Sequence, residues 1–193
     1  MYYQAMRLFV ALNFAQDLRD RWVAETASLR AAAPTAHWLP AEQLHLTLAF
    51  LGEQPDSSVA ALRPGLDRLA ASGAAHSLAL HGIGAFPHWR RPRVIWLGVD
   101  PEPALLSLAN SVAKACQALG IALDPRPFHP HITLGRIDAR VSPPQVQRLE
   151  QLAGEVTGRW RTDAHAVDLM SSTLTPNGAK HELVHRAKLG IRD

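Results

Sequence analysis

Two short segments of the sequence repeat one chemistry-bearing pattern. The segments His45-Leu46-Thr47-Leu48 and His131-Ile132-Thr133-Leu134 each place a threonine two residues after a histidine. Histidine has an ordinary pKa of about 6.5, so one imidazole can give a proton and another can take one near neutral pH. Side chains two residues apart on a strand share a side, so each threonine hydroxyl can donate to an anionic oxygen between the imidazoles. The pattern therefore predicts an acid, a base and two hydroxyl donors around one anion.

An anion held between an acid and a base suits in-line displacement at phosphorus. One histidine would take the proton of an attacking water while the other protonates the departing ribose oxygen, and each transfer contributes typically 10²- to 10⁴-fold. A nucleoside 2′,3′-cyclic phosphate has a strained five-membered ring, so we expect two histidines and two hydroxyl donors to suffice for its hydrolysis. Arg136 is a further candidate contact to the phosphate. On an ideal strand it points away from His131, so a twist, a bulge at Gly135 or the end of the strand must turn it.

The two patterns occupy equivalent places in a duplicated chain. Each half, at about 6–86 and 93–189, reads as strand, helix, His-x-Thr-Leu strand, helix and strand. The interval from the opening strand to the motif is 39 residues in the first half, from 6 to 45, and 38 in the second, from 93 to 131. Duplicated lobes of this kind usually face each other across a pseudo-twofold axis. We therefore expect the two motif strands to line one cleft.

Hydrophobic periodicity predicts the elements that must position these residues. Strands are expected over 6–12, 45–51, 77–86, 93–99, 131–137, 160–169 and 181–189, and helices over 17–29, 57–71, 105–119 and 143–152. The second helix is expected to be capped by Ser57 or Ser58. Phe50 alternates away from His45 and Thr47, which favours a place in the core. Cys116 lies on the apolar face of its helix and is expected to be a small core residue.

Composition bounds the class of protein. The chain has 193 residues, 47% hydrophobic and 19% charged, with 20 Lys and Arg against 17 Asp and Glu, which gives a formal charge of +3. This is an ordinary soluble composition, and the single Cys116 excludes an internal disulfide framework. No signal peptide or spanning segment is visible, so we expect a cytoplasmic protein with no membrane partner. The small net charge favours a compact phosphate pocket over a long nucleic-acid surface.

The motifs resemble those of a known family. His45–Gly52 (HLTLAFLG) and Pro130–Arg136 (PHITLGR) are similar to the paired H-x-T-x motifs of the 2H phosphoesterase superfamily. Met6–Leu12 (MRLFVAL) and Trp38-Leu39-Pro40 resemble its RNA 2′,3′-cyclic phosphodiesterase, or 2′-5′ RNA ligase-like, family. The resemblance covers nearly the whole chain from Met6 onward.

The resemblance carries expectations about fold and function. It implies one bilobal α+β domain over 1–193, in which two antiparallel sheets flank a central cleft with helices outside. It implies hydrolysis of RNA or nucleoside 2′,3′-cyclic phosphate to a 2′-phosphomonoester without metal or other cofactor. It also implies that His45 is the proton donor and His131 the proton acceptor, with Thr47, Thr133 and Arg136 on the phosphate. RNA ends or small cyclic nucleotides are then the expected partners, and we expect a monomer.

One position departs from the family pattern. Ser172–His181 resembles the C-terminal stretch S-x-L-x-x-x-G-x-x-Y, but His181 stands where tyrosine is usual. If that tyrosine stacks on a base, the substrate preference of this chain differs.

Other interpretations of the sequence remain open. A related enzyme would act on ADP-ribose 1″,2″-cyclic phosphate or run in reverse as a 2′-5′ RNA ligase, and a non-catalytic module would bind RNA ends without turnover. His129 and His131 have the spacing of a chelating pair, but no cysteine or carboxylate cluster accompanies them, so zinc is disfavoured.

Overall fold

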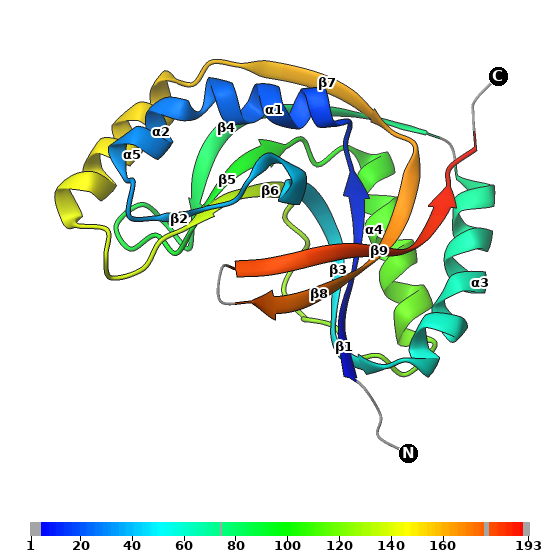
Figure 1. Ribbon diagram of the computed structural model, residues 1–193. Helices are drawn as coiled ribbons and strands as arrows, with labels where there is room; N and C mark the ends of the chain where they lie inside the picture. The colour runs from blue at the N-terminus through cyan, green and yellow to red at the C-terminus, as the bar shows by residue number, and fades with distance from the viewer. Residues whose placement is uncertain (1–4, 74, 176–177, 191–193) are drawn as a thin grey trace.

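Apolar strands that pair only with antiparallel neighbours form a single curled sheet (Figure 1). The computed structural model describes residues 5–73, 75–175 and 178–190. The strands are β1 (Ala5–Asn13), β2 (His37–Trp38), β3 (His45–Pro55), β4 (His76–Phe86), β5 (Val94–Val99), β6 (His131–Arg136), β7 (Arg159–Ala164), β8 (Ala166–Thr175) and β9 (Gly178–Lys188). Their order in the sheet is β7-β4-β5-β6-β3-β1-β8-β9, and β2 pairs with β6.

Helices cover the sheet in two groups (Figure 1). They are α1 (Gln16–Glu25), α2 (Ala27–Ala32), α3 (Ser57–Ser72), α4 (Pro103–Gln117) and α5 (Pro143–Glu155), with a 3₁₀ turn at Ala41–Gln43. Helices α3 and α4 pack on each other and on β3, and α3 also contacts β9. Helices α2 and α5 pack together, and α5 contacts β4. The α+β fold is confirmed, and no helix in the described ranges is long and apolar enough to cross a bilayer.

The two halves of the sheet do not coincide with the two halves of the sequence. We call the half of the sheet formed by β3, β1, β8 and β9 the first lobe, and the half formed by β6, β5, β4 and β7 the second lobe. Strand β4 belongs to the first half of the sequence but pairs with β5 and β7, whereas β8 belongs to the second half but pairs with β1. The expected antiparallel sheets meet edge to edge where Leu46 of β3 pairs with Ile132 of β6, so they form one continuous sheet.

The expected strand over 160–169 is two strands. It divides at His165 into β7, which pairs with β4 at one end of the sheet, and β8, which pairs with β1 in the other lobe. The buried apolar residues are Trp160 and Ala164 in β7 but Val167 and Leu169 in β8, so the alternation changes phase at the break and the prediction of one strand was wrong. Partner choice, which decides where this strand ends, depends on residues far away in the sequence.

Two helices also differ from their expected form. The helix expected over 17–29 divides at Thr26, whose hydroxyl donates to the carbonyl of Trp22 at 2.7 Å. Such local side-chain bonds compete with the regular helical pattern. Helix α3 runs through Pro64 and begins after Asp56, with no side-chain capping bond, so the predicted cap at Ser57 or Ser58 was wrong.

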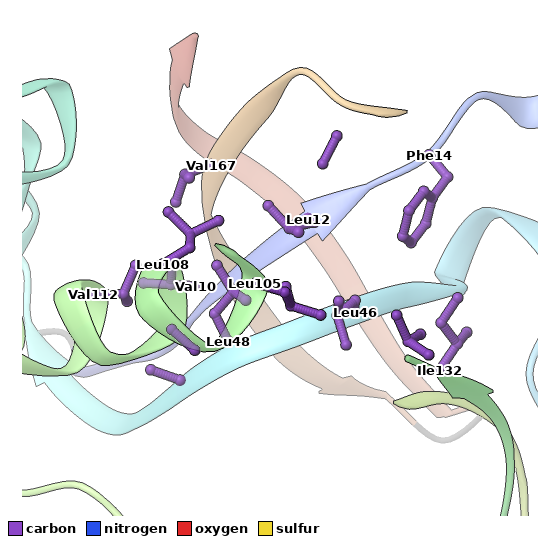
Figure 2. Close-up of a cluster of buried hydrophobic side chains, with 14 of the residues drawn as sticks. Val10, Leu12, Phe14, Leu46, Leu48, Leu105, Leu108, Val112, Ile132 and Val167 are labelled. Atoms are coloured by element: carbon purple, nitrogen blue, oxygen red, sulfur yellow. The ribbon is translucent and has the colours of Figure 1, made fainter. Parts of the chain in front are cut away.

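The main core lies on one side of β3 and β1 (Figure 2). Val10 and Leu12 of β1 pack with Leu46 and Leu48 of β3 in this cluster. Helix α4 supplies its apolar face to the same cluster, namely Leu105, Leu108, Val112 and the fully buried Cys116. Because even-numbered residues at the start of β3 face this core, the odd-numbered residues between them face the opposite side.

Candidate active site

The two motifs come together at the seam between the lobes. Leu46 and Ile132, the apolar residues at the centre of the motifs, are paired across the antiparallel strands and are fully buried. One step to either side of this pair, each motif histidine stands across from the threonine of the other motif. Both histidines and both threonines are half-buried and lie on the sheet face opposite the core. The structure thus brings the four side chains to one place.

Each motif histidine is held by a backbone carbonyl two residues before it. The Nδ1 of His45 lies 2.7 Å from the carbonyl oxygen of Gln43, and the Nδ1 of His131 lies 2.7 Å from that of His129. A carbonyl can only accept, so Nδ1 must carry the hydrogen in both rings. In the neutral imidazole the Nε2 lone pair is then free to take a proton. The contribution of His129 comes from its backbone carbonyl, which accepts the hydrogen bond from Nδ1 of His131.

Burial makes both motif histidines weak bases. Desolvation lowers the pKa of His45 to about 4, although the hydrogen bond that its Nδ1–H donates to the Gln43 carbonyl acts in the opposite direction, and the nearby charges of His181 and His131 lower it further. Burial likewise lowers the pKa of His131, again against a bond to a backbone carbonyl. An anion bound between the rings would favour their protonated forms and raise both pKa values.

A β-bulge turns Arg136 toward the site. The adjacent residues Ile95 and Trp96 of β5 pair with Gly135 and Thr133. Leu134 is therefore an extra residue on β6. Leu134 and Gly135 are both buried, whereas Arg136 is exposed. One extra residue reverses the alternation of the strand, which brings Arg136 to the side of the motif. Of the three possibilities that the sequence left for turning Arg136, a twist, a bulge at Gly135 or the end of the strand, the structure shows a bulge directly before Gly135.

The charge of Arg136 acts on two histidines. It lowers the pKa of His131 and also that of His181, in each case after the larger effect of burial. The guanidinium therefore lies near both rings. Among the described residues, Arg136 has no ion-pair partner, so its charge is available to an anion.

Phe50 occupies the position in β3 that Arg136 occupies in β6. Adjacent residues of β1 pair with Thr47 and Ala49, so Leu48 is an extra residue directly after the first motif. This bulge turns Phe50 to the side of His45, where the residue is 62% exposed. The prediction that Phe50 belongs to the core was wrong, because it assumed regular alternation along the strand.

Aromatic rings surround the first motif histidine. The His45 ring lies 4.9 Å from the ring of Phe9 and 5.2 Å from that of His181, measured between centroids. Phe9 and His181 are themselves 5.0 Å apart, edge to face. Phe50 extends this surface, with its ring 6.1 Å from Phe9. The sequence singled out His181 as a departure, but Phe9 was hidden in an apolar strand.

The second motif histidine also packs on aromatic rings. His131 lies edge to face with Phe86 at 4.9 Å between centroids and 6.4 Å from Trp96. Neither aromatic residue was predicted to lie near the site, because both belong to strands that read as ordinary apolar runs. The two lobes therefore present different groups to an anion at the seam. One carries the exposed Phe50 ring, and the other carries the Arg136 charge.

Within 5–73, 75–175 and 178–190, no group of three or more His, Cys, Asp or Glu side chains is placed to hold a metal ion.

Comparisons with known proteins agree on one family. The sequence profile of the 2′-5′ RNA ligase superfamily matches residues 15–175. A Geobacillus stearothermophilus protein named RNA 2′,3′-cyclic phosphodiesterase is 36% identical over 77% of this chain, and the chain spans about half, 48%, of its length. An Archaeoglobus fulgidus protein of the same name is 32% identical over 90% of this chain and 94% of its own.

Solved structures agree with the sequence comparisons. The crystal structure of Escherichia coli LigT complexed with 3′-AMP matches with a TM-score of 0.75 and 29% identity, over 96% of this chain and 99% of that chain. The fold, the paired motifs and the matched profile lead to one conclusion: the chain belongs to the 2′-5′ RNA ligase superfamily of 2H phosphoesterases.

Proposed function

We propose that this protein hydrolyses RNA or nucleoside 2′,3′-cyclic phosphates to 2′-phosphomonoesters, with two histidines as acid and base and no metal ion. The observation that carries the proposal is the pair of motif histidines at the lobe seam, His45 and His131, each tied at Nδ1 to a carbonyl at 2.7 Å. The names of the relatives support the substrate class. Every residue invoked comes from one chain, so the proposal needs only a monomer.

The proposed reaction is a single in-line displacement. The Nε2 of His131 takes a proton from water as the water oxygen bonds to phosphorus, and the bond from phosphorus to the ribose 3′-oxygen breaks. His45 gives its proton to that leaving oxygen, which leaves the phosphate on the 2′-oxygen. The hydroxyls of Thr47 and Thr133 and the guanidinium of Arg136 would bind the non-bridging oxygens, whose negative charge increases in the transition state. Exchange of protons with solvent then restores both histidines.

The difference between the lobes supports the assignment of acid and base. The leaving oxygen belongs to the ribose, so the general acid must lie on the nucleoside side of the phosphate. Phe50, an exposed ring on the side of His45, offers a surface for a nucleobase. Arg136 lies beside His131, where the phosphoryl oxygens would be held. This arrangement favours His45 as the proton donor and His131 as the proton acceptor.

The lowered pKa values predict an acidic optimum for kcat/KM. This parameter reports the free enzyme, whose productive form has His45 protonated and His131 neutral. The pKa of His45 is about 4, and that of His131 lies below 6.5, so above this pH the productive fraction falls as His45 loses its proton. We expect kcat/KM to fall about tenfold per pH unit above pH 6.5. Initial rates at low substrate concentration test this, and a level profile between pH 6.5 and 8 would contradict it.

A product assay tests the proposed function directly. Incubation of the protein in EDTA with adenosine 2′,3′-cyclic phosphate is expected to yield adenosine 2′-phosphate, with no 3′-phosphate, because His45 protonates only the 3′-oxygen. Chromatography against both standards identifies the product. An inert protein, a strict metal requirement or a mixture of isomers would overturn the proposal.

The same assay separates the related functions. ADP-ribose 1″,2″-cyclic phosphate, and RNA ends offered for 2′-5′ ligation, are compared with the nucleoside substrate by kcat/KM. A higher value for either would replace the proposed substrate. Salt-dependent RNA binding with no turnover would instead identify a module that binds RNA ends.

A further inference from the structure

His181 places a third imidazole at the site, and the proposed reaction does not use it. It belongs to β9, which lies three strands from β3 in the order β3-β1-β8-β9. The curl of the sheet nevertheless brings its ring centroid to 5.2 Å from that of His45 and 5.0 Å from that of Phe9. The side chain is half-buried. It therefore belongs to the wall around the first motif.

The nitrogens of this ring are arranged differently from those of the motif pair. The Nδ1 of His181 is buried and has no hydrogen-bond partner among the residues that the structure describes, whereas the Nδ1 of both motif histidines donates to a carbonyl. A buried N–H without an acceptor is costly, so the hydrogen of the neutral ring is favoured on Nε2. The part of the ring that remains accessible then presents an N–H donor.

The surroundings of His181 favour this neutral form. Its pKa is lowered, chiefly by burial and also by the charge of Arg136. The charge that acts on it from another strand is that of Arg136 on β6, and the titratable ring of His45 on β3 lies 5.2 Å away between centroids. Its neighbours Lys180 and Glu182 alternate to the other face of β9 and pair with each other at 2.7 Å. A donor beside Arg136 and His45 lies among groups that attract an anion.

We propose that His181 binds the phosphoryl group of the substrate through its Nε2–H, as a neutral hydrogen-bond donor and not as a third acid or base. The substrate is the one given by the proposed function, on which this inference rests. A tyrosine hydroxyl at the same position would also be a neutral donor on an aromatic ring. The replacement of the usual tyrosine by His181 would then keep a neutral hydrogen-bond donor at this position.

Matched variants at position 181 test the donor. His181→Phe keeps a ring without a donor, His181→Gln places an amide N–H near the position of Nε2, and His181→Tyr supplies a hydroxyl. Titration with inorganic phosphate is the readout that does not depend on turnover. We expect about tenfold weaker phosphate binding for His181→Phe and binding within about twofold of wild type for the other two. The KM for adenosine 2′,3′-cyclic phosphate is expected to rise in parallel.

A control lies on the same strand. His185 bonds to Asp67 of α3 at 2.7 Å, away from the motif histidines, so His185→Gln is expected to leave phosphate binding unchanged. Thermal unfolding of each variant checks that the fold is kept.

Three results would overturn the inference. The first is that His181→Phe binds phosphate with wild-type affinity. The second is that His181→Phe and His181→Gln lose phosphate affinity equally. The third is that one limb of the pH profile of kcat/KM disappears in His181→Phe, which would mean that His181 transfers a proton. If the wild-type protein has no cyclic phosphodiesterase activity, the proposed function fails, but the phosphate titration still decides whether His181 is a donor.

Discussion

His45→Ala and His131→Ala are each expected to lower kcat for a 2′,3′-cyclic nucleotide by about 10²- to 10⁴-fold, because each removes one of two proton transfers. The fold should tolerate both changes, since these half-buried rings lie on the face opposite the core. Single-turnover rates with saturating adenosine 2′,3′-cyclic phosphate provide the measurement. His88→Ala, at an exposed histidine in the loop after β4, is the matched control and is expected to keep the wild-type rate.

A change of leaving group separates the two roles. A nucleoside 2′,3′-cyclic phosphate with sulfur in place of the bridging 3′-oxygen releases a thiolate, which needs no proton, so it should restore much of the rate in the variant that lacks the acid. We expect this rescue for His45→Ala and none for His131→Ala, which still lacks the base. Rescue of His131→Ala alone would reverse the assignment. Near-wild-type turnover of the cyclic nucleotide by either variant would exclude the two-histidine mechanism.

The centre of this site was predictable from local sequence pattern. Alternation along a strand depends only on neighbouring residues, so placing Thr47 beside His45 required no knowledge of the fold. The duplication added the second half of the site, because equivalent spacing in two lobes implies equivalent positions. The structure places both motifs at the seam, where Leu46 pairs with Ile132.

The surroundings of the motifs were not predictable in the same way. A bulge arises from the pairing of two strands, so the sequence of β3 alone does not show that Leu48 is an extra residue. Phe50 was assigned to the core for this reason. Arg136 was retained as a candidate because a twist, a bulge at Gly135 or the end of the strand could turn it toward the motif.

Contacts between distant strands were also beyond sequence pattern. His181 reaches His45 only because β9 follows β8 into the first lobe and the sheet curls. The segment 160–169 illustrates why local pattern does not show which strands pair. Its buried apolar residues shift from even to odd positions at His165, but this local change does not show that β7 pairs with β4 and β8 with β1. The choice of partner is a property of the whole sheet, and no local period records it.

Arg136→Ala is expected to lower kcat/KM by about 10²- to 10³-fold, because it removes a charged donor to the phosphoryl oxygens. Arg136→Lys should recover only part of the loss, since an ammonium ion cannot form the two parallel bonds of a guanidinium. Steady-state rates at low substrate concentration give the ratio. If Arg136→Ala keeps wild-type kcat/KM, Arg136 does not contact the substrate and the bulge has no catalytic purpose.

The bulge itself can be tested while Arg136 is left in place. A Cβ added at Gly135 would lie 2.6 Å from a ring carbon of Trp38, closer than packing allows, so Gly135→Val must shift the bulge or displace the indole. Because the bulge turns Arg136 toward His131, we expect kcat/KM to fall by at least tenfold although the arginine is present. Gly154→Ala is the control, because a Cβ at this position in α5 meets no atom within 4 Å. The double variant Gly135→Val/Arg136→Ala distinguishes two causes of this loss. If Gly135→Val acts by misplacing the guanidinium, it should lower kcat/KM little further once the arginine is gone. Additive losses of kcat/KM would mean that Gly135→Val disturbs the histidines directly.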